Sequence, residues 1–186
     1  MVKLVKPLVL FTVLFAVLTS GFTLKCGSET INPSNNKSLD ELVESPEYWN
    51  SWTNAIALKQ KAKELALIAN QYHQYVKNEY DCNDMAVDIW NMLGVGGDDW
   101  EPIKSVIVIG NLDEVKETYD QCNHAWLIIL NKPPGGFVTI YALEPTNGLM
   151  YRHTGNDADV DPNAKYFEGF FYANPSGLRE DLGDRW

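Results

Sequence analysis

Three residues of this sequence have side chains of the types that thiol chemistry requires: Cys82, His124 and Glu144. Nucleophilic catalysis by cysteine needs a thiolate, a histidine that exchanges a proton with it, and a third group that orients the imidazole. The three residues follow one another in the order cysteine, histidine, carboxylate. Whether they work together depends on the elements that position them.

The cysteine opens a segment with helical periodicity. From Cys82 to Leu93 the apolar residues recur at spacings of three and four, and Gly94 and the Gly96-Gly97 pair follow as helix-ending residues. A helix that begins at Cys82 would favour the thiolate, because its free N–H groups and dipole attract negative charge. The Cys82 N–H would then form half of an oxyanion hole.

The histidine and the glutamate flank strand-like runs. Such runs span residues 105–110, 125–130 and 137–143, and a further strand is expected over residues 166–172. Residues 131–136 are rich in Pro and Gly, which predicts a hairpin between the second and third runs. In an antiparallel hairpin the start of one strand lies beside the end of the other, so His124 and Glu144 should meet. The region from Pro46 to Asn78 has helical spacing, so helices precede an antiparallel sheet and the fold class is α+β.

The segments around these residues resemble the transglutaminase-like superfamily, which is related to papain-like peptidases. The matching segments are Tyr80-Asp81-Cys82-Asn83-Asp84-Met85-Ala86, His124-Ala125-Trp126 and Glu144-Pro145-Thr146. The resemblance implies N-terminal helices packed on an antiparallel sheet, in a transglutaminase-like/papain-like core. It implies that Cys82 is the nucleophile, His124 the general acid/base and Glu144 the orienting carboxylate.

Two departures from the pattern of this superfamily accompany the resemblance. Glu144 stands where the superfamily usually has aspartate, and Asn83 stands where an aromatic residue often follows the cysteine. The second oxyanion donor is therefore unassigned, and Tyr80 or a residue further upstream is the candidate. Trp126 is expected to shield the three residues.

Two functions follow from the resemblance. The first is an exported thiol-dependent acyl-transfer enzyme that acts on a peptide or protein substrate, by hydrolysis or by transamidation. The second is a catalytically inactive transglutaminase-like binding module at the cell surface. Neither requires a cofactor, and no metal site is expected, because His73 and His153 have no cysteine or histidine neighbours at ligand spacing. The oligomeric state is not readable from the sequence.

The composition of the first 38 residues predicts a leader followed by a linker. Lys3 and Lys6 precede a long uncharged, mostly apolar run, which predicts a signal peptide or membrane anchor over residues 1–25. A polar linker over residues 26–38 then leads to the domain at 39–186. Cys26 is either a lipidated cysteine of a lipoprotein or an unmodified thiol. The protein is expected outside the cytoplasm, secreted or tethered to a membrane.

The charge of the chain excludes one class of partner. With 25 acidic against 15 basic residues the formal net charge is -10, which argues against non-specific binding to nucleic acid. One further hypothesis concerns Cys122, which precedes His124 by two residues. If the strand already runs there, Cys122 should lie near Cys82, and an exported protein could join the two in an inactivating disulfide. The alternative is an unpaired cysteine in a loop.

Overall fold

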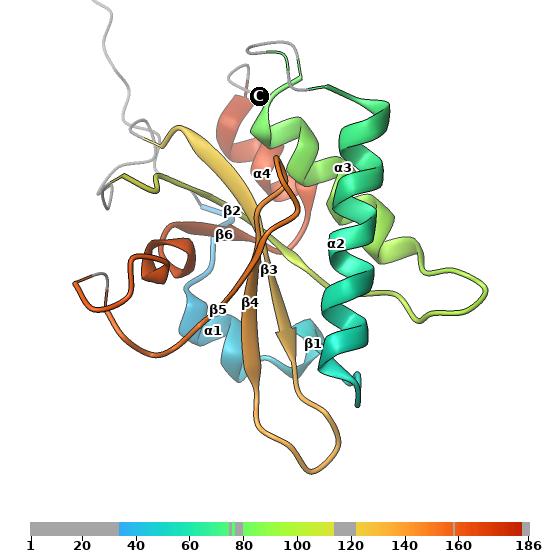
Figure 1. Ribbon diagram of the computed structural model, residues 1–186. Helices are drawn as coiled ribbons and strands as arrows, with labels where there is room; N and C mark the ends of the chain where they lie inside the picture. Colours follow the sequence, from blue (N-terminus) through green and yellow to red (C-terminus); the bar gives the residue numbers. More distant parts are fainter. Residues whose placement is uncertain (1–33, 75, 77–79, 114–121, 158, 184–186) are drawn as a thin grey trace, which may run out of the picture.

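The computed structural model describes residues 34–74, 76, 80–113, 122–157 and 159–183 (Figure 1). The predicted leader at 1–25, Cys26 and most of the predicted linker lie outside the described residues. None of the described helices combines the length and the apolar character that crossing a membrane requires.

A six-stranded sheet forms the centre of the molecule. Four of its strands follow one another in antiparallel pairs in the order β5-β4-β3-β2, with β6 antiparallel to β2 at the far edge and the short β1 parallel to β3. The strands are β1 (Trp49–Asn50), β2 (Val106–Gly110), β3 (His124–Asn131), β4 (Thr139–Leu143), β5 (Met150–Arg152) and β6 (Phe170–Tyr172). The predicted strands at 105–110, 125–130 and 137–143 correspond to β2, β3 and β4. The run at 166–172 supplies only β6, because Ala164–Phe167 forms a short 3-10 helix, η3.

Each of the four α-helices follows a residue whose side chain caps it. These helices are α1 (Leu39–Glu44), α2 (Ala55–Tyr72), α3 (Cys82–Val95) and α4 (Pro175–Leu182), and the 3-10 helix η1 (Pro46–Tyr48) lies between α1 and β1. The helical region predicted from 46 to 78 is interrupted by β1, and α2 starts only where the Asn54 side chain accepts hydrogen bonds from two backbone N–H groups. The helix predicted to begin at Cys82 does begin there.

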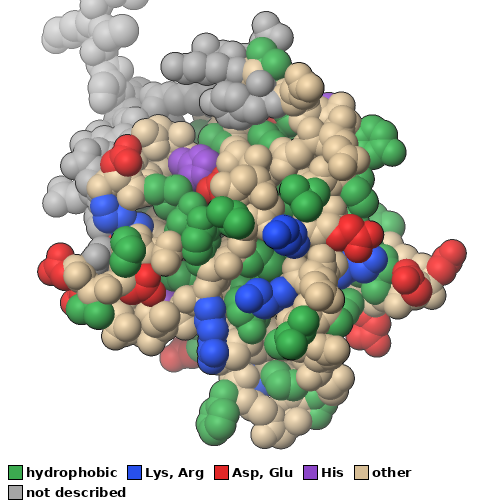
Figure 2. All heavy atoms as spheres, in the orientation of Figure 1, with side chains coloured by type: hydrophobic (Ala, Val, Ile, Leu, Met, Phe, Trp, Pro, Cys, Tyr) green, Lys and Arg blue, Asp and Glu red, His purple; other side chains and the backbone are tan. Residues whose placement is uncertain are grey.

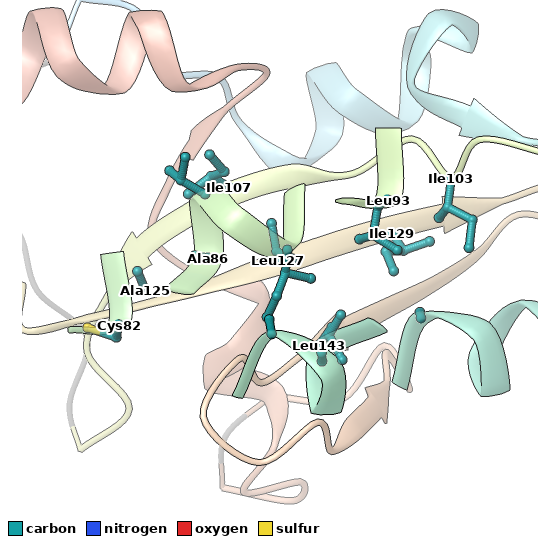
Figure 3. Packing of buried hydrophobic residues seen from close by; sticks show 14 of the residues in the cluster. Cys82, Ala86, Leu93, Ile103, Ile107, Ala125, Leu127, Ile129 and Leu143 are labelled. Atoms are coloured by element: carbon teal, nitrogen blue, oxygen red, sulfur yellow. The ribbon is translucent and has the colours of Figure 1, made fainter. Parts of the chain in front are cut away.

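Both faces of the sheet are covered by apolar side chains. On one face, side chains such as Ile107, Leu127 and Leu143 pack against α2 and α3, and Figure 3 shows Cys82 at one end of this cluster. On the other face, Val108, Trp126 and Ile128 pack with residues of α1 and η3. Successive side chains of a strand point to opposite faces, so β3 contributes to both layers and is buried from Ala125 to Asn131. We call these the helix layer and the Trp126 layer.

The Trp126 layer contains one tight approach that can be tested. Gly110 is the last residue of β2 and pairs with His124, and a Cβ atom at Gly110 would lie 2.5 Å from Cη2 of Trp126. Trp126 is fully buried and its indole N–H donates to the Tyr166 carbonyl at 2.7 Å, so the ring cannot move away freely. We expect Gly110→Ala to lower the free energy of unfolding by about 1–3 kcal/mol through overpacking.

Urea denaturation of the full chain measures this effect, and Gly94→Ala is the matched control. A Cβ atom at Gly94 meets nothing within 4 Å, and Gly94 lies inside α3. The control should therefore be neutral or stabilising, because alanine is the better helix former. Equal unfolding free energies for Gly110→Ala and Gly94→Ala would contradict the tight contact between Gly110 and the Trp126 ring.

Candidate functional site

Cys82 is the first residue of α3, and its position is fixed by the cap of that helix. The Asp81 side chain accepts a hydrogen bond from the Asn83 N–H at 3.1 Å, and the Asp84 side chain accepts one from the Asp81 N–H at 3.3 Å. The sulfur lies 4.0 Å from the Asn123 carbonyl oxygen, directly before β3, and only 8% of the residue is exposed. The thiol is thus held between the start of a helix and the start of a strand.

His124 and Glu144 are joined by a short hydrogen bond. Nε2 of His124 lies 2.7 Å from Oε2 of Glu144. His124 begins β3, and Glu144 directly follows the last paired residue of β4, where Leu143 faces Leu127. The antiparallel register predicted from the sequence is the cause of this proximity. The glutamate is 3% exposed, so the pair is largely shielded from water.

The Glu144 carboxylate has further donors around it. Oε1 accepts hydrogen bonds from the N–H of Thr146 at 3.1 Å and from its hydroxyl at 2.7 Å, and the Tyr166 hydroxyl donates to Oε2 at 3.2 Å. Burial raises the pKa of Glu144, but the hydrogen bonds from His124 and Thr146 and the charge of His124 outweigh burial and lower the pKa overall. Each oxygen of the Glu144 carboxylate therefore accepts two hydrogen bonds.

Thr146 and Tyr166 were not predicted as site residues. Thr146 stands in the Glu144-Pro145-Thr146 segment, so its place two residues after the carboxylate is a signal that sequence reasoning could have used. Tyr166 lies in η3, far along the chain, and no pattern in the sequence connects it to Glu144.

The pKa of His124 favours a positively charged imidazole at neutral pH. Burial lowers its pKa, but hydrogen bonds to Cys82 and Glu144, together with the charges of these two residues, raise it to about 9. Because Nε2 faces Glu144, Nδ1 is the nitrogen left for the thiol. The structure therefore brings Cys82, His124 and Glu144 together, and their catalytic roles stay a prediction.

Cys82, His124 and Glu144 lie at one end of the sheet, and they come from both of its faces. Cys82 belongs to the helix layer, whereas His124 has the same strand parity as Trp126, on the opposite face. The ring centroids of His124 and Trp126 are 5.7 Å apart. Trp126 thus lies beside the imidazole, and the sequence predicted that it would shield the three site residues.

The structure also shows where Tyr80 and Cys122 lie. The Tyr80 hydroxyl donates to Asp88 at 2.8 Å, and burial and this bond raise the pKa of the phenol. It therefore points along α3 and is not aimed at the sulfur as a second oxyanion donor. Cys122 packs against the same apolar cluster as Cys82, but both residues are present as thiols and not as a disulfide. Among the described residues, no group of three or more His, Cys, Asp or Glu side chains is placed to hold a metal ion.

Comparison with known proteins gives one family match. The family described as ricin-type beta-trefoil lectin C-terminal domain matches residues 41–161, which is more than half of the chain. No curated protein matches. Among solved structures, a crystal structure of Polyporus squamosus lectin bound to the human-type influenza-binding epitope Neu5Acα2-6Galβ1-4GlcNAc is similar at 15% identity and a TM-score of 0.36. The similarity covers 50% of this chain and 32% of that one, so the chain spans about a third of that lectin's length.

The family match overturns the resemblance to the transglutaminase-like superfamily. The predicted transglutaminase-like/papain-like fold class is corrected with it: the helices and the antiparallel sheet described above belong to a member of a lectin-type family. The predicted acyl-transfer enzyme, whether hydrolase or transamidase, and the alternative of an inactive transglutaminase-like module are wrong for the same reason.

The error has a physical cause. The three matching segments describe a cysteine at a helix start and a histidine and carboxylate across a strand pair. This constellation recurs on unrelated folds, because it reflects local geometry and not ancestry. Short motifs of this kind therefore located the three side chains without identifying the family.

Proposed function

Because this chain belongs to the ricin-type beta-trefoil lectin C-terminal domain family, we propose that it serves in carbohydrate recognition as a lectin-type domain. The observation that carries the proposal is the match over residues 41–161, which spans α2, α3 and the strands β1 to β5. The partner is then a glycan, either free or displayed on a glycoprotein. The acidic character of the chain is consistent with a partner other than nucleic acid.

A glycan array probed with the labelled full chain tests this function. We expect saturable binding to a subset of glycans and its competition by the same oligosaccharides in solution. Heat-denatured protein is the control, because specific recognition requires the folded surface. If no glycan on the array is bound above this control, the carbohydrate-recognition function is refuted.

A second role is supported by the site geometry. We propose that Cys82, His124 and Glu144 form a reactive-thiol centre, with the sulfur as nucleophile, the imidazole as its proton partner and the carboxylate as the group that orients the ring. The support is the 2.7 Å contact between His124 and Glu144 and the raised pKa of the imidazole. This proposal concerns the three side chains and not the overturned acyl-transfer function.

We also propose export of the protein. Residues 1–25 act as a signal peptide or anchor, residues 26–38 as a linker, and residues 39–186 as the domain, whose family match begins at residue 41. The location is then outside the cytoplasm, with the N-terminal segment as the contact to the membrane. Recovery of the full-length protein in the cytoplasmic fraction would contradict this assignment.

A further inference from the structure

A groove of about 320 Å³ runs along the exposed side of α2, next to the turn that leads into β5. One wall consists of the α2 residues Ile56, Lys59, Gln60 and Lys63, and the other consists of residues 148–150. Ligand pockets range from about 300 to 1,000 Å³, so a groove of this size suits one or two side chains of a partner and not a large ligand. We call it the α2 groove.

The second wall of the α2 groove is held in place by the turn after β4. The Glu144 N–H donates to the Leu149 carbonyl, and the Gly148 N–H donates to the Glu144 carbonyl, each at 2.9 Å. Gly148 has a φ of +68°, which favours glycine, and a Cβ atom there would lie 3.4 Å from both the Lys63 carbonyl oxygen and the Leu67 side chain. The turn therefore lies directly against α2. Walls that are ordered before binding reduce the entropy lost on association.

The α2 groove has exposed apolar side chains on both walls. Ile56 is 69% exposed, and Leu149 on the opposite wall is 45% exposed. Covering these side chains by a partner would remove apolar surface from water, which favours association. Apolar side chains that face one another across a groove differ from the scattered apolar residues of an ordinary surface, and they indicate a binding surface.

Three cations surround this apolar surface. The Lys59 ammonium lies 5.5 Å from the centre of the Tyr141 ring, and Tyr141 pairs with Arg152 across β4 and β5. Paired residues of antiparallel strands share one face of the sheet, so Arg152 lies on the face that α2 covers. Lys63 is exposed one turn further along α2. Figure 2 shows Lys and Arg side chains (blue) near the centre of the face on which α2 and β4 lie in Figure 1.

The charges of Lys59, Lys63 and Arg152 are not neutralised within the described part of the chain. None of the three forms an ion pair with a described residue, whereas Lys61 on the same helix bonds to Glu64 at 3.0 Å. None of the described residues that line the groove is acidic. Because the chain as a whole has a formal net charge of -10, an acidic partner would be repelled elsewhere and attracted to this groove.

We propose that the α2 groove binds a short acidic peptide segment of a partner protein. The segment inserts an apolar side chain between Ile56 and Leu149, and its carboxylates pair with the three cations. Ile56 to Lys63 spans about 10 Å of helix, which about three residues of an extended peptide cover. The concave shape of the groove favours a peptide over an anionic membrane, because a bilayer cannot enter a hollow of this width. The proposal depends neither on carbohydrate recognition nor on the reactive-thiol centre.

Fluorescence anisotropy of labelled hexapeptides with the full chain tests the proposal. Peptides with two central Leu, Ile or Phe residues flanked by Glu should bind. Their counterparts with Lys in place of Glu, or with Ser at the centre, should not. Lys63→Glu should weaken binding at least tenfold, because repulsion replaces attraction. Lys61→Glu is the matched control: it makes the same charge change on the same helix, outside the groove, and should bind within about twofold of the wild type.

A second pair of variants tests the apolar contact. Ile56→Ser should weaken binding at least fivefold, whereas Val160→Ser, which changes a 70% exposed residue in the loop after β5, should bind as the wild type does. All four substitutions are on the surface, and circular dichroism checks that the fold is retained.

Two results would overturn the proposal even if all variants fold. The first is equal weakening by Lys63→Glu and Lys61→Glu, or no binding of any acidic peptide by the wild type. The second is binding to vesicles of phosphatidylserine and phosphatidylcholine that Lys63→Glu abolishes, without binding of any peptide. That second result would assign this face to a membrane surface instead.

Discussion

Replacing His124 by alanine should slow the alkylation of Cys82 by iodoacetamide at pH 7 at least tenfold. The thiolate is the form that reacts, and an ordinary thiol is only a few per cent ionised at this pH. In the wild type the pKa of His124 is about 9, so a positively charged imidazole accompanies the sulfur at neutral pH. In His124→Ala the sulfur loses both the positive charge beside it and the proton partner that we propose for it.

Mass spectrometry separates alkylation at Cys82 from alkylation at Cys122, and two variants serve as controls. His153→Ala removes a histidine that packs edge-on against Phe167, in the Trp126 layer, and should leave the rate unchanged. Glu144→Gln keeps the imidazole but removes the charge that orients it, so its rate should fall between the two. Equal rates in His124→Ala and the wild type would mean that the sulfur and the imidazole do not act as a pair.

The free energy of unfolding should fall by about 3 kcal/mol at most as the pH rises from 6.5 to 9. The pKa of His124 is raised from 6.5 to about 9 in the folded protein. Below pH 6.5 the imidazole is protonated in both the folded and unfolded states, so its contribution to stability is fully present. That contribution is lost as the pH passes through 9. The pKa of Glu144 is lowered, so the contribution of Glu144 is present above about pH 4.5 and is lost as the pH falls through the folded-state pKa.

Urea denaturation at pH 6 and pH 9.5 measures the difference. Glu144→Gln should flatten this pH dependence, because the carboxylate is one of the two partners that raise the pKa of His124. His153→Ala should retain the wild-type pH dependence. The same loss of stability in the wild type and in Glu144→Gln would show that the buried pair is not its source.

The local structure around the reactive-thiol centre could be predicted from the sequence. The periodicity after Cys82 and the glycines that follow Leu93 locate α3, and the turn residues between β3 and β4 set the register that joins His124 to Glu144. These features depend on residues close together in the chain, which is why a pattern reveals them.

The features that were not predicted depend on contacts between distant parts of the chain. The strand β1 has two residues and exists because the buried Asn50 side chain bonds to the backbone of Lys104 and Leu130. The bond from Tyr166 to Glu144 also has no counterpart in local spacing. Family membership was missed for a different reason, since three short segments carry geometry that unrelated families share.

The position of Cys82 and His124 in different layers has a consequence for local unfolding. The sulfur is held by the packing of α3 on one face of the sheet, and the imidazole by the strands and by Trp126 on the other. Partial melting of either face would separate the two atoms even though the remaining face stayed intact. We therefore expect the enhanced reactivity that we propose for Cys82 to require both layers to be packed, and to be lost at a local opening of either layer, before global unfolding.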